Sequence, residues 1–230
     1  MQKLENSLVI HQPDFAPYIG FFNRLIYVDN FVILDHVNFN KRGWTHRDKI
    51  KCQNQPVWLS VPITKSTKDG PINEVCIDHS SNWVKDHLKR IKGCYQKAIF
   101  FDEIYPIIEN HYTRKVKKLS DFNKGIIITI IELLEININL VHSSDYELNS
   151  TSNHLMIDIC KKLKCDNYLS GLGAKNYMIP ELFTKENINI VWQEFKPREY
   201  KQVTGEFIEN LSIFDTLFNC GVAETKELIK

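Results

Sequence analysis

Three polar clusters in this sequence carry residue types that could do chemistry. The first, HQPDFAPYIGFF at residues 11–22, contains His11 and Asp14. A histidine can act as a general base or hold a phosphate, because its pKa lies near working pH. A helix beginning near Pro17 would turn its free N–H groups toward the same place, which favours an anionic ligand such as a nucleotide phosphate. The alternative is a histidine that only hydrogen-bonds a backbone group of its loop.

The second cluster, DHVNFNKRGWTHRDKIK at residues 35–51, is a basic loop. Guanidinium forks suit phosphate or carboxylate recognition, while Asn38 and His46 add polar groups and Trp44 adds a stacking plane. Its place directly after a predicted strand favours phosphate binding. The alternatives are a solvated surface loop and, with less support from the overall charge, a polynucleotide partner such as tRNA. Within residues 38–51 the loop sets five cations against one acid, Asp48: Lys41, Arg42, Arg47, Lys49 and Lys51.

The third cluster is YLSGLGAKNY at residues 168–177. Gly171 and Gly173 would let the backbone approach a ligand closely, and Ser170, Lys175 and Tyr177 offer polar groups. The run lacks the third glycine of a dinucleotide fingerprint, and its serine is not in a GxSxG elbow, so a serine hydrolase is not indicated. A tight strand-to-helix turn is the alternative interpretation.

The elements that must position these clusters alternate between strand and helix. Short apolar runs predict strands at 7–10, 31–34, 57–63, 73–78, 138–141, 167–169 and 188–192. Helical spacing predicts helices at 18–27, from Trp83 to Tyr95, at 100–112 with an interruption at Pro106, at 120–134, at 152–163, at 181–183 and within the tail from 195. The strands at 57–63 and 73–78 are expected to pair as an antiparallel hairpin on the sheet edge.

This order of elements predicts an α/β fold with a mainly parallel sheet flanked by helices. We expect one domain over residues 1–230 with a helical subdomain at about 83–136. In such sheets ligands bind at the carboxyl ends of the strands. Three polar runs occupy that position, at residues 11–14, 142–144 and 170–174, and they should meet at one edge of the sheet.

Composition limits the possible functions. The 230 residues are 43% hydrophobic and 25% charged, which excludes disordered and fibrous classes. The net charge of +1 is too small for a protein whose main task is to coat nucleic acid or an anionic membrane. No apolar run approaches the ~20 residues of a membrane span and no signal peptide is recognised, so a cytoplasmic protein without a membrane partner is expected. The six cysteines show no zinc-like spacing, which predicts reduced thiols and no metal site.

The ordered combination of motifs resembles the WbqC family. The likeness runs from about residue 7 to 221 and is carried by HQPDFAPYIGFF, DNFVILDHVNFNKRGWTHRDKIK, WLSVPI, YLSGLGAKNY and LSIFDTLFNCG. Phe15 stands where the family commonly has Tyr, and Leu172 stands where it commonly has Pro. The first difference removes a hydroxyl and its hydrogen bond, and neither removes another ionisable group.

The resemblance implies a role in the biosynthesis of bacterial O-antigen, and so of lipopolysaccharide, or of another surface polysaccharide. The implied reaction transfers an amino acid or acyl group, with glycine suggested for the family, to the amine of a nucleotide-linked amino sugar, expected to be dTDP-linked. Charged tRNA, an aminoacyl adenylate made from ATP, and an acyl-CoA are all open as the acyl donor. No cofactor is assigned. The alternatives are an ATP-dependent activating enzyme and a non-catalytic sugar-nucleotide-binding protein.

Amide formation requires a base for the sugar ammonium, donors for the developing oxyanion and anchors for the pyrophosphate. We expect His11 to be the base, with Asp14 or Asp35 orienting it, and Ser170 to serve the oxyanion together with backbone N–H groups near it. The remaining candidates are expected to bind substrate: Gln12, Tyr18, Asn38, Lys41, Arg42, Trp44, His46, Arg47, Ser143, Ser144, Gly171, Gly173, Lys175 and Tyr177.

Overall fold

The computed structural model describes residues 1–230 and confirms the α/β class. Its main sheet is fully parallel, with the strand order β5-β2-β1-β6-β7. After β1 the chain adds β2 and β5 on one side of it, and later adds β6 and β7 on the other side. The direction of strand addition therefore reverses between β1 and β6. Such a topological switch point is where open α/β sheets bind ligands. The strands are β1 (Ser7–His11), β2 (Asn30–Ile33), β5 (Asn139–His142), β6 (Asn167–Ser170) and β7 (Asn189–Trp192).

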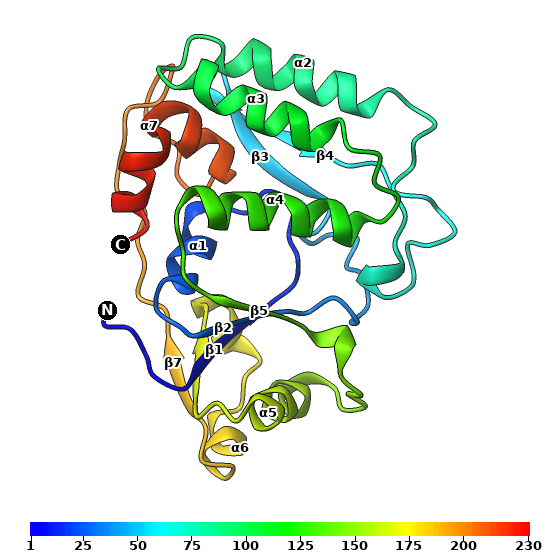
Figure 1. Cartoon of the computed structure of the whole chain (residues 1–230), viewed down its shortest axis with the longest axis vertical. Helices are drawn as coiled ribbons and strands as arrows, with labels where there is room; N and C mark the ends of the chain where they lie inside the picture. Colours follow the sequence, from blue (N-terminus) through cyan, green and yellow to red (C-terminus); the bar gives the residue numbers. More distant parts are fainter.

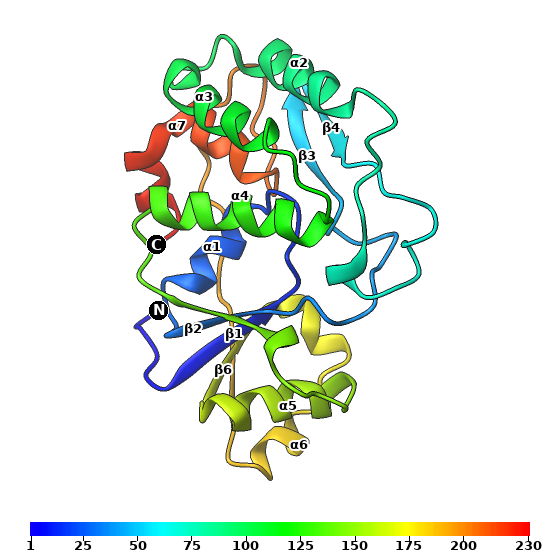
Figure 2. The ribbon, with the colours of Figure 1, turned by 45° about the vertical axis from the view of Figure 1, so that its right-hand side comes forward.

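Helices cover both faces of this sheet (Figures 1 and 2). The helices α1 (Ile19–Leu25), α4 (Leu119–Leu133) and α7 (Ile213–Leu228) lie on one face, and α5 (Ser152–Leu163) and α6 (Pro180–Thr184) lie on the other. Alternate strand residues enter two separate cores, one on each face. Burial on both faces explains why the central strands β2, β1 and β6 are continuous apolar runs in the sequence.

The helical middle of the chain packs on the same core as the α1 face of the sheet. This segment contains α2 (Trp83–Tyr95) and α3 (Phe101–Tyr112), and their buried residues share one cluster with β1, β2 and α4. Helix α3 continues through Pro106, although a proline at an interior position removes one backbone hydrogen bond and crowds the carbonyl four residues earlier. Three short 3-10 helices complete the chain, at Ile72–Glu74, Ser143–Asp145 and Leu172–Asn176. None of the helices is both long and apolar enough to traverse a lipid bilayer.

The predicted hairpin of 57–63 with 73–78 forms only as one antiparallel bridge, between Ile63 and Ile77, and it does not lie on the edge of the main sheet. The strand β3 (Arg47–Cys52) pairs with β4 (Gln55–Ser60) in a separate two-stranded antiparallel sheet. Residues 73–78 form part of a 3-10 helix followed by isolated bridges. The charged side chains of β3 hid its alternation, in which Asp48 and Ile50 point inward.

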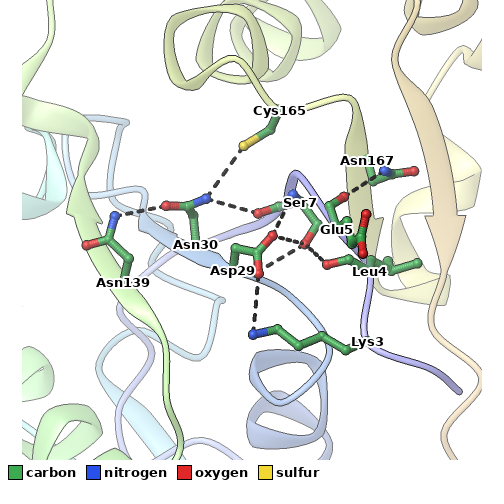
Figure 3. Close-up of polar contacts among 9 residues, drawn as sticks. All are labelled: Lys3, Leu4, Glu5, Ser7, Asp29, Asn30, Asn139, Cys165 and Asn167. Atoms are coloured by element: carbon green, nitrogen blue, oxygen red, sulfur yellow. Dashed lines mark hydrogen bonds and ion pairs between the residues drawn. The ribbon is translucent and has the colours of Figure 1, made fainter.

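Asparagines fix the amino end of the parallel sheet (Figure 3). The side-chain amide of Asn139 donates to Asn30 Oδ1 at 2.8 Å. Outside the view of Figure 3, the amide of Asn189 donates to Asn167 Oδ1 at 3.1 Å. The amides of Asn30 and Asn167 donate in turn to main-chain carbonyls of the segment that enters β1. Each asparagine is the first residue of its strand, so this ladder sets the register at the edge opposite the polar loops.

The prediction of six reduced thiols is wrong for one pair. Cys52 at the end of β3 and Cys94 in α2 form a disulfide, with their Cα atoms 4.8 Å apart. They are 42 residues apart in the sequence, so their spacing carried no signal of pairing. The other cysteines are free thiols: Cys76, Cys160, Cys165 and Cys220.

Removal of this disulfide is expected to destabilise the protein. We expect Cys94→Ser to lower the free energy of unfolding by about 2–4 kcal/mol, because the bond restricts the unfolded chain. Denaturant unfolding without reductant measures the difference, with Cys76→Ser as the control at a free thiol. Equal unfolding midpoints for the two variants would show that the disulfide contributes nothing to stability.

Candidate functional site

A cleft opens at the carboxyl ends of β1 and β6, at the switch point of the sheet. It consists of two adjoining cavities of about 450 and 470 Å³, and both are lined by His11, Asp14 and Trp44. We call the first the charged chamber, because Arg24 and Asp48 also line it. We call the second the neutral chamber, because no lysine or arginine lines it.

Arg24 is the central cation of the charged chamber. It projects from α1, is only 5% exposed, and its Nη1 donates to Gln193 Oε1 at 3.3 Å. Its Nε has no partner, and no carboxylate lies within 4.0 Å of the guanidinium. Burial lowers the pKa of Arg24, although nearby tyrosines and Asp14 oppose this effect. An unpaired buried guanidinium is costly, so this arrangement suits a bound anion such as a phosphate.

Arg24 is not among the site residues predicted from the sequence, although the sequence around it contains a feature that could have identified it. It is a single cation inside the apolar helical run that contains Phe21 and Leu25, where a solvated residue would not be expected. The spacing of that run predicted its helix correctly. The spacing could not tell that the one charged residue on this helix faces the carboxyl edge of the sheet.

Gly171 makes room for the Arg24 guanidinium. A Cβ atom at this position would lie 2.7 Å from Arg24 Nη1. Gly171 has an ordinary φ of −72°, so an alanine there would not strain the backbone. Gly173 lines the charged chamber, but a Cβ atom at that position would meet nothing within 4 Å. The two glycines of the predicted turn therefore have different roles.

This difference predicts a matched pair of variants. Gly171→Ala should fold normally and weaken binding of a nucleoside diphosphate by about tenfold, because it displaces a charge-assisted hydrogen-bond donor. Gly173→Ala should bind as the wild type does. Isothermal titration with dTDP measures both affinities, and equal affinities for the two variants would contradict the role given to Gly171.

His11 and Asp14 lie side by side between the two chambers. His11 Nδ1 is 3.0 Å from the Gln12 carbonyl oxygen, which assigns the proton to Nδ1, and 3.6 Å from Asp14 Oδ2. Burial, together with the charge of Arg24, lowers the pKa of His11 to about 3, so the imidazole is neutral. Burial raises the pKa of Asp14 to about 7, although Thr45 Oγ1 donates a hydrogen bond to it at 3.3 Å. Asp14 therefore titrates near neutral pH.

Asp48 is a second carboxyl on the charged chamber. It comes from β3, is buried, and accepts the backbone N–H of Lys49 at 2.6 Å. Burial raises its pKa, and the nearby charge of Asp14 adds to this effect. The chamber therefore presents one guanidinium and two carboxyls, a layout that complements a ligand with both a negative and a positive group.

Two aromatic side chains flank the cleft and remain open to solvent. Trp44 is 47% exposed and Tyr177 is 68% exposed. Trp44 packs beside Trp58 with ring centres 5.4 Å apart, and the Lys49 ammonium lies 5.9 Å from its ring centre. Exposed aromatic faces beside a cavity suit stacking on a base or a sugar.

Seven of the predicted residues line the cleft, whereas Asp35 lies elsewhere. Asp35 Oδ1 accepts from Ser143 Oγ at 3.3 Å and from the Ser144 N–H at 3.2 Å, and its other oxygen is 3.6 Å from Lys124 Nζ. These contacts join the ends of β2 and β5, so Asp35 does not orient His11. The seven residues in the cleft are His11, Gln12, Asp14, Tyr18, Trp44, Gly173 and Tyr177.

The cations of the basic loop fold onto the loop and its neighbours instead of entering the cleft. Lys41 pairs with Asp69, and the Arg47 guanidinium lies 4.6 Å from the Trp58 ring centre and donates to the Arg42 carbonyl at 3.1 Å. The His46 ring packs against Phe39, and the backbone of Asn38 bridges to Pro71. The residues of this loop that line the cleft include none of its five cations; they are Val37, Asn40, Gly43, Trp44 and Asp48.

In the predicted glycine turn, the residues at the end of the segment line the cleft, whereas the Ser170 side chain near its start does not. Ser170 is buried, with its hydroxyl 3.5 Å from Met178 Sδ, and Lys175 lies over the Trp192 ring at 5.3 Å. Neither side chain lines the cleft, whereas Tyr177 and Met178 do. The segments that contain His11, Arg42 and Ser170 thus meet at one cleft. His11 lines it directly, whereas the segments of Arg42 and Ser170 line it through neighbouring residues.

Comparison with known proteins gives one family. Residues 12–227 match the WbqC-like protein family. The chain is also 30% identical over 227 residues to the uncharacterized protein Rv1507c of Mycobacterium tuberculosis, and the match covers 97% of each chain. No solved structure matches significantly.

Proposed function

Because the chain belongs to the WbqC-like protein family, we propose that it is a transferase acting on a nucleotide-linked amino sugar in the biosynthesis of O-antigen or another surface polysaccharide. The group transferred is an amino acid or acyl group, with glycine suggested by the family resemblance. The observation that carries the proposal is the charged chamber, in which an unpaired buried guanidinium faces two carboxyls. That layout complements the diphosphate and the ammonium of such a sugar.

The proposed binding mode follows from these charges. The diphosphate accepts hydrogen bonds from Arg24, and the sugar ammonium lies against the carboxyls of Asp14 and Asp48. Trp44 or Tyr18, which both line the charged chamber, stacks on the base or the sugar ring. The acceptor amine then lies beside the groups that both chambers share.

Asp14 is the better base for this reaction, in place of His11. A general base works best when its pKa lies near the operating pH, and the pKa of Asp14 is about 7 while that of His11 is about 3. Asp14 takes one proton from the sugar ammonium, and the free amine attacks the acyl carbon of an activated ester or thioester. The new C–N bond forms, the bond from the acyl carbon to the leaving oxygen or sulfur breaks, and the second amine proton leaves with that atom.

His11 is a positioning residue in this scheme. Its neutral ring packs edge-on against Phe21 with ring centres 5.1 Å apart, and its Nδ1 lies beside both the Gln12 carbonyl and Asp14. A positive charge on this ring would stabilise the Asp14 carboxylate and lower its pKa. Because the ring is neutral, the raised pKa of Asp14 is kept.

The experiment combines purified protein with a dTDP-linked amino sugar and three donors in separate reactions: glycine with ATP, glycyl-tRNA, and glycyl-CoA. The proposal predicts a sugar nucleotide heavier by one glycyl residue with at least one donor, and no product when the sugar carries a hydroxyl in place of the amine. A thermal shift with the sugar nucleotide but no product with any donor would support a non-catalytic binding protein. Consumption of ATP with glycine, without transfer to the sugar from any donor, would instead support an activating enzyme.

A further inference from the structure

The neutral chamber is not needed to hold the phosphorylated sugar, yet it is as large as the charged chamber. Its volume of about 470 Å³ lies in the range of about 300–1,000 Å³ that small-molecule sites occupy. Apolar side chains form most of its wall, among them Leu34, Leu155, Met156 and Met178. No lysine or arginine lines it, so it offers no side-chain cation to a polyphosphate.

The two chambers lie on opposite faces of the sheet. Leu34, Leu155 and Met178 belong to the core between the sheet and α5, whereas Phe21 of the charged chamber belongs to the core beneath α1. The chambers meet only at the residues that they share, which include Asp14. Two ligands bound in the two chambers would therefore bring their ends together at Asp14, as a bimolecular transfer requires.

Apart from His11 and Asp14, which both chambers share, the polar side chains of the neutral chamber are amides and hydroxyls. Gln12 Oε1 accepts a hydrogen bond from Thr45 at 3.3 Å, while the Gln12 amide nitrogen has no partner in the protein. Asn153 Nδ2 donates to the Tyr177 carbonyl at 3.1 Å and its Oδ1 accepts the Ile179 N–H at 3.0 Å. These bonds tie the segment that carries Tyr177 and Met178 to α5, and so close this wall of the chamber.

We propose that the neutral chamber binds the nucleoside part of the activated acyl donor. Apolar, thioether and aromatic surfaces with a free amide suit an uncharged heteroaromatic ring and its ribose. This inference rests on the proposed function, because it supplies that reaction with its second substrate. Adenosine is the chemistry common to an acyl adenylate, an acyl-CoA and the 3′ end of a charged tRNA, so adenosine is the probe.

The test is isothermal titration of adenosine into the wild type and two variants of a half-buried residue on α5. Met156→Trp fills the neutral chamber and should weaken adenosine binding by at least about tenfold, while Met156→Leu keeps the volume and should bind as the wild type does. Binding of dTDP, which occupies the charged chamber, should be unchanged in both variants. Adenosine that does not bind, or that binds Met156→Trp equally well, would overturn the proposal.

A second measurement keeps the test valid if Met156→Trp fails to fold. Adenosine titrated into wild-type protein saturated with dTDP should bind with unchanged affinity, because the two ligands occupy separate chambers. Displacement of one by the other would overturn the inference. Titrations with AMP, coenzyme A and a glycylated tRNA minihelix then identify the donor, as the ligand that binds more tightly than adenosine and is weakened by Met156→Trp.

Failure of this inference is distinguishable from failure of the proposed function. Adenosine binding that depends on Met156, without amide product from any donor, would contradict the proposed reaction but support the nucleoside site. Amide formation that proceeds equally well in Met156→Trp would support the proposed reaction and contradict the nucleoside site in the neutral chamber.

Discussion

Replacement of Arg24 by methionine is expected to weaken binding of dTDP by roughly 100-fold, without loss of stability in the unliganded protein. A buried charge pair between a guanidinium and a diphosphate contributes about 3 kcal/mol or more to affinity. Methionine keeps much of the volume of the arginine stem and removes a buried cation that no carboxylate pairs. The free energy of unfolding without ligand should therefore be unchanged or higher, because the uncompensated charge is gone.

Lower affinity for dTDP together with unchanged or higher stability distinguishes a ligand-binding arginine from a structural one. Titration calorimetry and denaturant unfolding of the same samples measure the two quantities. Arg42→Met is the matched control, since it removes an exposed arginine from outside the cleft. Arg24→Lys should show intermediate affinity, because it keeps the charge and loses the planar fork. An Arg24→Met variant that is destabilised but still binds dTDP would assign Arg24 to the scaffold.

Replacement of Asp14 by asparagine is expected to slow amide formation by about 10²–10⁴-fold, which is the usual contribution of a general base. Affinity for the sugar nucleotide should change much less, since Arg24 and Asp48 remain. The wild-type rate should rise with pH and level off above about 7, because only the ionised carboxyl of Asp14 accepts a proton. Initial rates from about pH 5.5 to 8.5 measure this profile on both sides of that pKa. An asparagine variant with the same rate and the same profile would exclude Asp14 as the base.

The same variant makes a separate prediction for stability. The pKa of Asp14 is about 7 in the folded protein against 3.8 for the ordinary group, so the folded state binds more protons between these values. The contribution of Asp14 to stability therefore falls as pH rises from about 4 to 7. Asp14→Asn should accordingly be more stable than the wild type at about pH 8, with the gain shrinking toward about pH 4. Comparison with the wild type cancels the effect of the buried His87 and His111, whose lowered pKa values act in the opposite direction.

The parallel sheet could be predicted from sequence because its strands are short apolar runs, and the three central strands β2, β1 and β6 are buried on both faces. The same reasoning brought the loops that follow β1 and β6 to one edge, and the structure places the cleft there. The hairpin of β3 and β4 could not be predicted in this way. Its first strand carries charges on one side and Asp48 on the other, so its residues have the composition of a loop.

The residues of the cleft were only partly predictable, because proximity to a motif does not decide which way a side chain points. Lys41 and Arg47 had the right chemistry for phosphate, but Asp69 and Trp58 engage them outside the cleft. Arg24 was hidden in a helix whose other residues, apart from Asn23, are apolar, and its role depends on the space left by Gly171 far along the chain. That contact joins residues from two distant segments, which a single sequence does not reveal.

A crystal structure of the protein with a dTDP-linked amino sugar is the decisive experiment for this binding mode. We expect the diphosphate within hydrogen-bond distance of the Arg24 guanidinium and the sugar amine beside the Asp14 carboxyl. A sugar nucleotide seated instead on the loop of Lys41 and Arg42, with the switch-point cleft empty, would show that the charged chamber is not the substrate site.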